Sequence, residues 1–167
     1  FSLVSEAVFN AASLVSTSGL QSNAGIFTLL SPAFVFAILL IGGSTYSSAG
    51  GLKFYRVGAM LFHARQYLAK LVYPHAVTPR HFGTEAYNLQ IMRAIWVMCI
   101  SSIFVIAMGS GLLALLGLDF QASITASVAA FTNAGPAYSP DWAPRGAEGW
   151  LAYHEMGIGM KFALAAI

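Results

Sequence analysis

An uninterrupted stretch without charge, from Ala94 to Leu118, constrains the fold of this chain more than any other feature. It is longer than the roughly 20 apolar residues that an α-helix needs to cross a lipid bilayer. Only 8% of the chain is charged and 57% is hydrophobic, whereas a soluble domain carries about 25% charged residues. With so little charge, the apolar faces must meet lipid or other protein. The sequence therefore predicts an α-helical integral membrane protein.

The basic residues predict how the chain is oriented in the membrane. Six of the eight Lys and Arg fall between Lys53 and Arg93, whereas residues 119–149 hold three acidic residues and one arginine. Loops rich in Lys and Arg stay on the cytoplasmic side of a membrane. We therefore expect residues 53–93 in the cytoplasm and residues 119–149 outside.

Two shorter apolar segments, 5–15 and 122–131, cannot span a bilayer by themselves. Each runs into a turn of small residues, and placing Gly19 on Gly135 aligns the two turns at an offset of 116 residues. The aligned residues are Ser16, Thr17, Ser18 and Gly19 in the first turn and Thr132, Asn133, Ala134 and Gly135 in the second. Such repetition reports on architecture. It predicts a repeated unit of spanning helix, re-entrant half-helix, glycine turn and spanning helix.

A polar stretch with glycines at both ends, 42–51, separates an apolar segment at 27–41 from a helix predicted over 52–73. Its residues are Gly42, Gly43, Ser44, Thr45, Tyr46, Ser47, Ser48, Ala49, Gly50 and Gly51, and Lys53 follows closely. The spacing of a phosphate-binding loop is not met, and no strand precedes the stretch. At membrane depth such a break lines a cavity or is buried in protein, because lipid cannot satisfy bare backbone groups.

These turns have the chemistry of a cation pathway. Backbone carbonyl oxygens can replace the hydration shell of a cation, and the carboxyl end of a half-helix adds partial negative charge. Neither turn contains a charged residue, which suits a monovalent cation, because a fixed carboxylate would hold the ion too tightly. A positive charge at Lys53 would raise the barrier to a cation at the cytoplasmic mouth.

Three segments, VSTSGL (15–20), GGSTYSSAGGLKFYR (42–56) and FTNAGPAYSP (131–140), resemble the Trk/Ktr/HKT superfamily of potassium transport proteins, in particular its bacterial Trk type. The resemblance implies an all-α membrane protein of helix–pore-loop–helix repeats, in which four pore loops surround one selectivity filter. The filter residues would be Ser16, Thr17, Ser18, Gly19, Thr132, Asn133, Ala134 and Gly135, with potassium at Thr17, Ser18, Gly19, Asn133, Ala134 and Gly135. The gate loop would comprise Gly42, Gly43, Ser44, Thr45, Ser47, Ser48, Gly50, Gly51 and Lys53, in a broken transmembrane helix.

The same resemblance divides the chain into three parts. Residues 1–73 correspond to the end of a third repeat, residues 74–93 to a cytoplasmic connection, and residues 94–167 to most of a fourth repeat. The first two repeats of the family are not contained in this sequence. We therefore expect the chain to be part of a longer protein.

The resemblance also implies a location and partners. We expect a multi-pass protein of the bacterial inner membrane that contacts lipid and forms a homodimer. A cytoplasmic, nucleotide-binding regulatory subunit of the RCK type is expected to dock on residues 53–93. Potassium is the expected substrate, and neither a covalent cofactor nor nucleic acid is expected. Whether potassium moves by symport with H⁺ or Na⁺ stays open.

Two other functions fit parts of the pattern. A secondary transporter with a closed midplane site also uses broken helices. A membrane enzyme would need converging His, Asp or Glu residues inside its spans, and the sequence offers almost none. We also expect Lys161 to approach the gate loop or the pore, and Trp150 to lie in the aromatic belt at a membrane interface.

Overall fold

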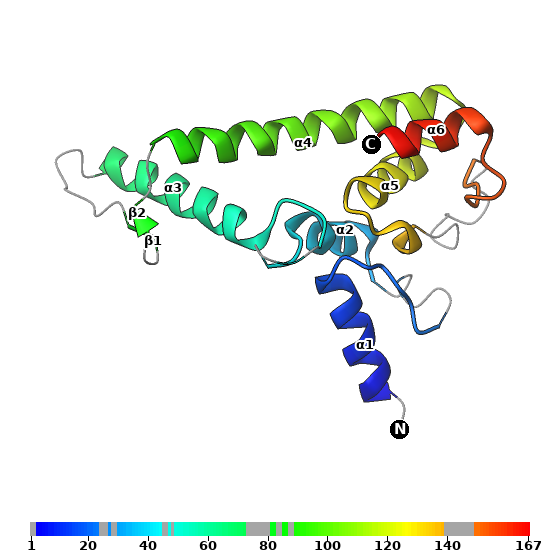
Figure 1. Ribbon diagram of the computed structural model, residues 1–167, viewed down its shortest axis with the longest axis horizontal. Coiled ribbons are helices and arrows are strands. Elements are labelled where there is room, and N and C mark those ends of the chain that lie inside the picture. Colours follow the sequence, from blue (N-terminus) through cyan, green and yellow to red (C-terminus); the bar gives the residue numbers. More distant parts are fainter. Residues whose placement is uncertain are drawn as a thin grey trace.

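The computed structural model describes residues 3–23, 27, 30–44, 47, 49–72, 81–82, 85–86, 89–138 and 149–167. Helices dominate this part of the chain (Figure 1). The elements are α1 (Leu3–Val15), α2 (Pro32–Ile41), α3 (Phe54–Val72), β1 (His81–Phe82), β2 (Glu85–Ala86), α4 (Leu89–Leu115), α5 (Phe120–Phe131), the 3-10 helix η2 (Gly135–Ala137) and α6 (Ile158–Ala166). The helical fold class is as predicted, apart from a short hairpin.

The longest helix, α4, is the one candidate membrane span among the described residues. Its segment Ile91–Leu115 is long and apolar enough to cross a bilayer. Large apolar side chains along it stay uncovered, with Val97 exposed to 65% and Phe104 to 62%. Apolar surface of this extent on one element marks contact with lipid or with another part of a protein.

The bounds of α4 differ from the predicted 94–118. The helix begins five residues earlier, at Leu89, so the end of the predicted connection 74–93 is already helical. It ends at Leu115, because Gly117 takes a φ of 98°. There the amides of Gly117 and Leu118 bond to the carbonyls of Ala114 and Leu113, at 3.1 and 3.2 Å. Such a bond pair with a left-handed glycine is a common way to end a helix.

Helix α5 is the buried centre of the fold. It lies between α4 and α2, and α6 runs beside the carboxyl-terminal end of α4 (Figure 1). The side chain of Asp119 caps its start by accepting from the amide of Gln121 at 3.0 Å. Small residues let it pack closely; its buried residues are Ala122, Ser123, Thr125, Ala126, Ser127, Val128 and Ala129.

Helices α3 and α4 form a long antiparallel pair, and α1 projects away from the rest of the chain (Figure 1). The antiparallel strands β1 and β2 lie in the connection between α3 and α4, and they pair Phe82 with Glu85. No sequence pattern predicted this hairpin. With two residues in each strand, it is too short to show the alternation that identifies strands.

The last helix also starts later than predicted. The apolar residues that follow the loop 137–149 predict a helix that starts near Trp150, but α6 begins at Ile158. The preceding residues form turns, in which the amides of Glu155 and Met156 both bond to the carbonyl of Ala152. An apolar composition alone does not distinguish a helix from a folded loop that is covered by aromatic side chains.

Candidate functional site

The turns that follow α1 and α5 have the same backbone geometry. The repeat-related residues Thr17 and Asn133 have φ values of 57° and 56°. Corresponding backbone bonds close both turns: Thr17 to Leu14 at 3.2 Å, Ser18 to Ser13 at 3.1 Å, Asn133 to Ala130 at 3.0 Å and Ala134 to Ala129 at 2.9 Å. Each bond keeps the offset of 116 residues seen in the sequence. The same helix ending thus occurs at both predicted filter turns.

The two turns contact each other. A Cβ atom added to Gly19, which has a φ of 69°, would lie 2.9 Å from the Ala137 nitrogen and 3.0 Å from the Ala134 oxygen. The side-chain amide of Gln21 donates to the carbonyl of Pro136 at 3.2 Å. The structure therefore brings together the filter residues that the sequence predicts in two distant segments.

The predicted gate loop lies against both turns. The amide of Gly50 donates to the Oγ1 atom of Thr17 at 2.7 Å. A Cβ atom added to Gly50 would overlap the carbonyl oxygen of Thr132. Gly43 lies close to the end of α1, since a Cβ there would be 3.3 Å from the Val15 oxygen. One loop thus meets the carboxyl ends of both short helices.

The loop ends where the sequence placed its glycines. Helix α2 stops before Gly42, which has a φ of 70°. Gly51 has a φ of 77°, and a Cβ there would lie 2.6 Å from the Leu39 oxygen. Side chains at these two positions would meet backbone atoms, so only glycine fits. Three residues of the stretch, Thr45, Tyr46 and Ser48, lie outside the described residues.

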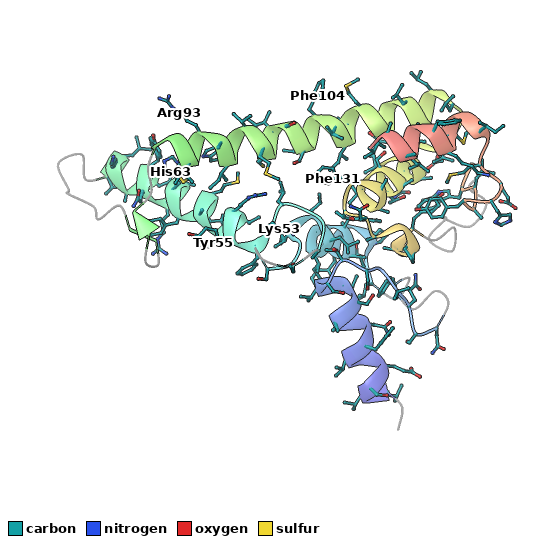
Figure 2. All side chains as sticks on the ribbon, viewed as in Figure 1. Lys53, Tyr55, His63, Arg93, Phe104 and Phe131 are labelled. Carbon is teal, nitrogen blue, oxygen red and sulfur yellow. The ribbon has the colours of Figure 1, made fainter. Side chains whose placement is uncertain are left out.

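Lys53 folds back onto the loop. Its ammonium group donates to the carbonyl of Ser47 at 2.7 Å and to the carbonyl of Ala49. Lys53 itself has a φ of 71°, which is unusual for a residue with a side chain. Figure 2 shows it at the middle of the structure, where the loop meets α3. The positive charge therefore binds the oxygens of the loop itself.

Aromatic side chains support the second turn. The hydroxyl of Tyr153 donates to the carbonyl of Gly135 at 3.0 Å, and the hydroxyl of Tyr138 donates to the carbonyl of Leu151 at 2.9 Å. The Tyr138 ring lies 5.1 Å from the Tyr153 ring and stacks on Trp150 at 6.0 Å. Burial raises the pKa of both tyrosines to about 12.

Sequence reasoning missed this aromatic group. Tyr138 lies within the quoted segment 131–140, but no pattern distinguished Tyr153. The ring of Trp150, which is predicted to lie in an interfacial belt, stacks on the ring of Tyr138. The stacking of aromatic rings after the second turn could be expected only once it is known that the chain after α5 folds back on itself.

The first turn is supported by Asn10 on α1. Its side-chain amide donates to the Glu6 carbonyl at 2.8 Å and to Ser22 Oγ at 2.9 Å. Its oxygen accepts from the Ser22 amide at 3.1 Å. These bonds tie the chain that leaves Gly19 back to α1, so the turn is held on both sides.

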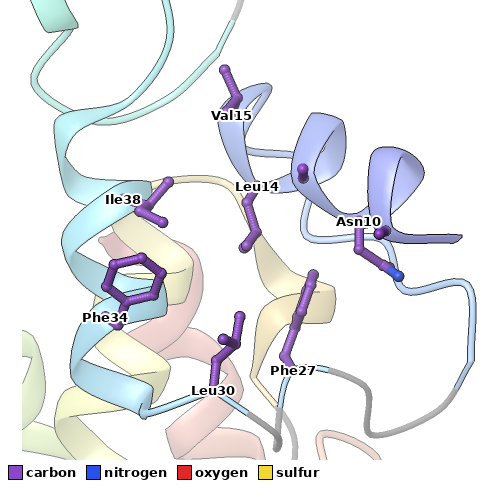
Figure 3. A pocket seen from close by; sticks show the side chains of 9 residues that line it. Asn10, Leu14, Val15, Phe27, Leu30, Phe34 and Ile38 are labelled. Carbon is purple, nitrogen blue, oxygen red and sulfur yellow. The ribbon is translucent and has the colours of Figure 1, made fainter. Parts of the chain in front are cut away.

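An apolar cavity of about 420 Å³ separates α1 from α2 (Figure 3). Figure 3 shows Leu14 on α1 facing Phe34 and Ile38 on α2 across it. The lining residues are Ala7, Asn10, Ala11, Leu14, Val15, Phe27, Leu30, Phe34 and Ile38. Among these lining residues only Asn10 has a polar side chain, and its polar atoms bond to Glu6 and Ser22. The lining residues therefore offer no chemistry suited to an ion.

A second cavity of about 420 Å³ opens beside Gly135 and also borders Tyr153 and Lys161. A Cβ atom added to Gly135 meets no described atom within 4 Å. Lys161 donates to the His154 carbonyl at 3.3 Å. Lys161 therefore lies beside the second turn.

The arrangement has the chemistry of a cation pathway more than that of a catalyst. Both turns end a helix, so their carbonyl groups carry the partial negative charge of a helix carboxyl end. Thr132 is fully buried and Thr17 is 3% exposed, and neither turn contains an ionisable side chain. Buried oxygens without fixed charge can bind a monovalent cation weakly enough to release it.

Comparison with known proteins identifies relatives of the chain. No protein-family model matches the chain. It is 28% identical over 138 residues to the Trk system potassium uptake protein TrkH of Escherichia coli strain K12. The aligned residues cover 80% of the chain and 28% of that protein. It is 28% identical over 151 residues to the Trk system potassium uptake protein TrkI of Halomonas elongata, covering 87% of the chain and 30% of that protein.

A third relative agrees with these two. The TrkH protein of Vibrio parahaemolyticus is 28% identical over 134 residues, covering 78% of the chain and 27% of that protein. The chain thus spans less than a third of the length of these relatives.

The helical fold and the uncovered apolar helix α4 are consistent with an α-helical membrane protein. The similarity to TrkH and TrkI proteins extends over about four fifths of the chain. The chain is similar to Trk system potassium uptake proteins. These relatives agree with the resemblance to the Trk type that the sequence indicates.

Proposed function

We propose that this chain forms part of a potassium uptake pathway across a bacterial inner membrane. In this proposal the turns at 16–19 and 132–135 supply two of the pore loops of a selectivity filter. Their backbone oxygens replace the water around a potassium ion. The loop at 42–51 is the gate on the cytoplasmic side of the filter.

The observation that carries the proposal is the contact between the two turns. A Cβ atom added to Gly19 would lie within 3.1 Å of atoms of Ala134 and Ala137, although the turns are 116 residues apart. Loops that share one ion path must meet around a common axis. Two half-helices that ended in separate places could not contribute carbonyl groups to the same ion.

The position of the gate loop is the second support. Its residue Gly50 touches Thr17 in one turn and Thr132 in the other. A loop in this position lies directly behind the carbonyl groups that would hold the ion. It also has no regular hydrogen-bond ladder over residues 42–44 and 49–53, and segments of this kind move more easily than packed helices.

The names of the relatives support the substrate. The TrkH and TrkI proteins are named as Trk system potassium uptake proteins. We propose the same substrate for the protein to which this chain belongs. We also propose that the complete protein is a multi-pass homodimer of three parts as divided above, and that a nucleotide-binding regulatory subunit docks on the basic residues 53–93.

Complementation tests the proposal. The full-length protein is expressed in a bacterium that lacks its own potassium uptake systems, and growth and ⁸⁶Rb⁺ uptake are measured at low external potassium. We expect the protein to restore both. Gly135→Ser should weaken the preference for potassium over sodium, because its hydroxyl projects into the open space beside the turn, and deletion of 44–49 should raise the leak of potassium.

One variant serves as a matched control for Gly135→Ser. Gly111→Ser places a hydroxyl on α4, where an added Cβ also meets nothing within 4 Å, but far from the turns in sequence. It should leave uptake and selectivity unchanged. Unaltered flux and selectivity in both Gly135→Ser and the 44–49 deletion would contradict the proposal.

The transport mode separates this pathway from an ion-coupled transporter. A pore passes ions down their electrochemical gradient, whereas a coupled transporter shows saturating exchange with a fixed ratio of ions. Flux through reconstituted full-length protein is therefore measured with potassium alone and then with Na⁺ or H⁺ gradients imposed. Flux that absolutely requires a second ion would replace the pore by a coupled transporter.

A further inference from the structure

We propose that Thr17 is a positioning residue that holds the gate loop closed against the filter, through the hydrogen bond from Gly50 to its side-chain oxygen. The inference rests on the proposed function, because it assigns a task within the same pathway. It also adds a physical link between the filter and the gate: one side chain belongs to the filter turn and binds the gate loop.

The first support is the burial of the acceptor. Thr17 is 3% exposed, and its Oγ1 atom lies 2.7 Å from the Gly50 nitrogen in a partly buried hydrogen bond. An amide that loses its acceptor at such a place is poorly compensated by water. The hydroxyl of Thr17 therefore adds a bond between the turn and the loop to the bonds that Lys53 makes with the loop carbonyls.

The second support is the backbone of Thr17. Its φ of 57° is in the left-handed region, which a β-branched residue rarely adopts. At the same place in the other turn stands Asn133, with a φ of 56°, and asparagine tolerates this conformation well. A threonine is thus a poor choice for the turn alone. Its hydroxyl contact with the loop gives it a reason to be there.

The third support is the steric contact on the other side of Gly50. Its Cα faces the carbonyl oxygen of Thr132 so closely that an added Cβ would overlap it. Gly50 therefore lies between Thr17 of the first turn and Thr132 of the second. If the loop moves away to let an ion pass, it must break the hydrogen bond to Thr17. It must also lose its close contact with the Thr132 carbonyl oxygen.

A pair of variants that differ by one oxygen atom tests this directly. Thr17→Ser and Thr17→Ala both remove the branch at Cβ, so they change the backbone preference in the same way. Only Thr17→Ser retains a hydroxyl that can accept from Gly50. Potassium flux is measured with purified full-length protein in lipid vesicles, in the absence of other subunits.

We expect the flux of Thr17→Ala to exceed that of Thr17→Ser about tenfold, because only the closed state of Thr17→Ala lacks the hydrogen bond from Gly50. Flux in Thr17→Ala that is equal to or below that of Thr17→Ser would overturn the inference. If Thr17→Ala is not recovered as folded protein, Thr17→Val replaces it, since it keeps the branch and lacks the hydroxyl.

A readout of loop position complements the flux. In a background without other reactive cysteines, Ser47→Cys reports access to the loop by its rate of reaction with a water-soluble thiol reagent. The rate should rise in Thr17→Ala and not in Thr17→Ser. Equal rates would overturn the inference even if the flux changed.

The two failures can be told apart. Wild-type vesicles without potassium flux would reject the proposed function, and the inference with it. Wild-type vesicles that conduct potassium, together with equal flux in the two Thr17 variants, would reject only the role of Thr17.

Discussion

The hydroxyl of Tyr153 donates a hydrogen bond of 3.0 Å to the carbonyl oxygen of Gly135. It links the segment before α6 to the second predicted filter turn. If the Gly135 carbonyl contributes to ion binding, the tyrosine sets its direction, because a carbonyl that accepts a strong bond from one side is less free to rotate toward the other.

Tyr153→Phe should therefore lower ion selectivity. The variant keeps the ring that packs against Tyr138 and removes only the donor. Because such a bond contributes about 0.5–1.5 kcal/mol, we expect the preference for potassium over sodium to fall by up to about tenfold. Reversal potentials of reconstituted full-length protein in mixed potassium and sodium measure this. Tyr67→Phe, on the exposed face of α3, is the control and should behave as the wild type.

The two filter glycines should respond differently to alanine. Gly19 has a φ of 69° and lacks room for a Cβ, whereas a Cβ on Gly135 meets no described atom within 4 Å. Gly19→Ala should lower the stability of the full-length protein by at least about 1–2 kcal/mol, the usual cost of a side chain in the left-handed region. Gly135→Ala should change stability little.

Thermal unfolding in detergent, followed by size-exclusion chromatography, compares the two variants. Equal stability losses in both would show that the turns are not packed against each other as described.

Removing the charge of Lys53 should loosen the gate loop. Its ammonium binds the carbonyls of Ser47 and Ala49, and hydrogen bonds from charged groups are stronger than neutral ones. Lys53→Met should therefore raise the basal leak of potassium several-fold, and Lys53→Arg should restore part of the closure. Lys70→Met, at the exposed end of α3, is the control for the loss of a basic residue.

⁸⁶Rb⁺ efflux from vesicles measures the leak. A leak that rises equally in Lys53→Met and Lys70→Met would assign the effect to net charge and not to the loop contacts.

Selectivity should not depend on tyrosine ionisation near neutral pH. Burial raises the pKa of Tyr153 and Tyr138 to about 12, above the ordinary value of about 10. A raised pKa means that the protonated hydroxyls stabilise the fold fully below about pH 10, and that this contribution is lost as the pH rises toward 12. Between about pH 6 and 9 both groups remain donors.

The selectivity ratio of the wild type should therefore stay constant across that range. Tyrosinate absorbance, as the difference between wild type and Tyr153→Phe, should show no titration of this hydroxyl below about pH 10. A titration near pH 10 or lower would mean that the hydroxyl of Tyr153, a residue that is 37% exposed, does not hold its bond to Gly135.

The local structure of the site could be predicted from the sequence. The short helices, the turns at 16–19 and 132–135 and the break at 42–51 depend on which residues stand at which spacing. Small residues and glycine end a helix through bonds within a few residues, and those bonds recur at Thr17 and Asn133 with nearly the same φ. The charge-free run that became α4 is local in the same sense, because helix formation in lipid depends on composition over about 20 residues.

The contacts between these pieces were decided only by the tertiary structure. Two contacts join segments that no sequence spacing relates: Gly50 fits between Thr17 and Thr132, and Tyr153 donates to Gly135. The late start of α6 was also decided by the tertiary structure. Many partners of similar apolar character could satisfy the same residues, so composition cannot choose among them. The choice follows from which surfaces fit when all helices pack at once, and that depends on shape at the scale of single atoms.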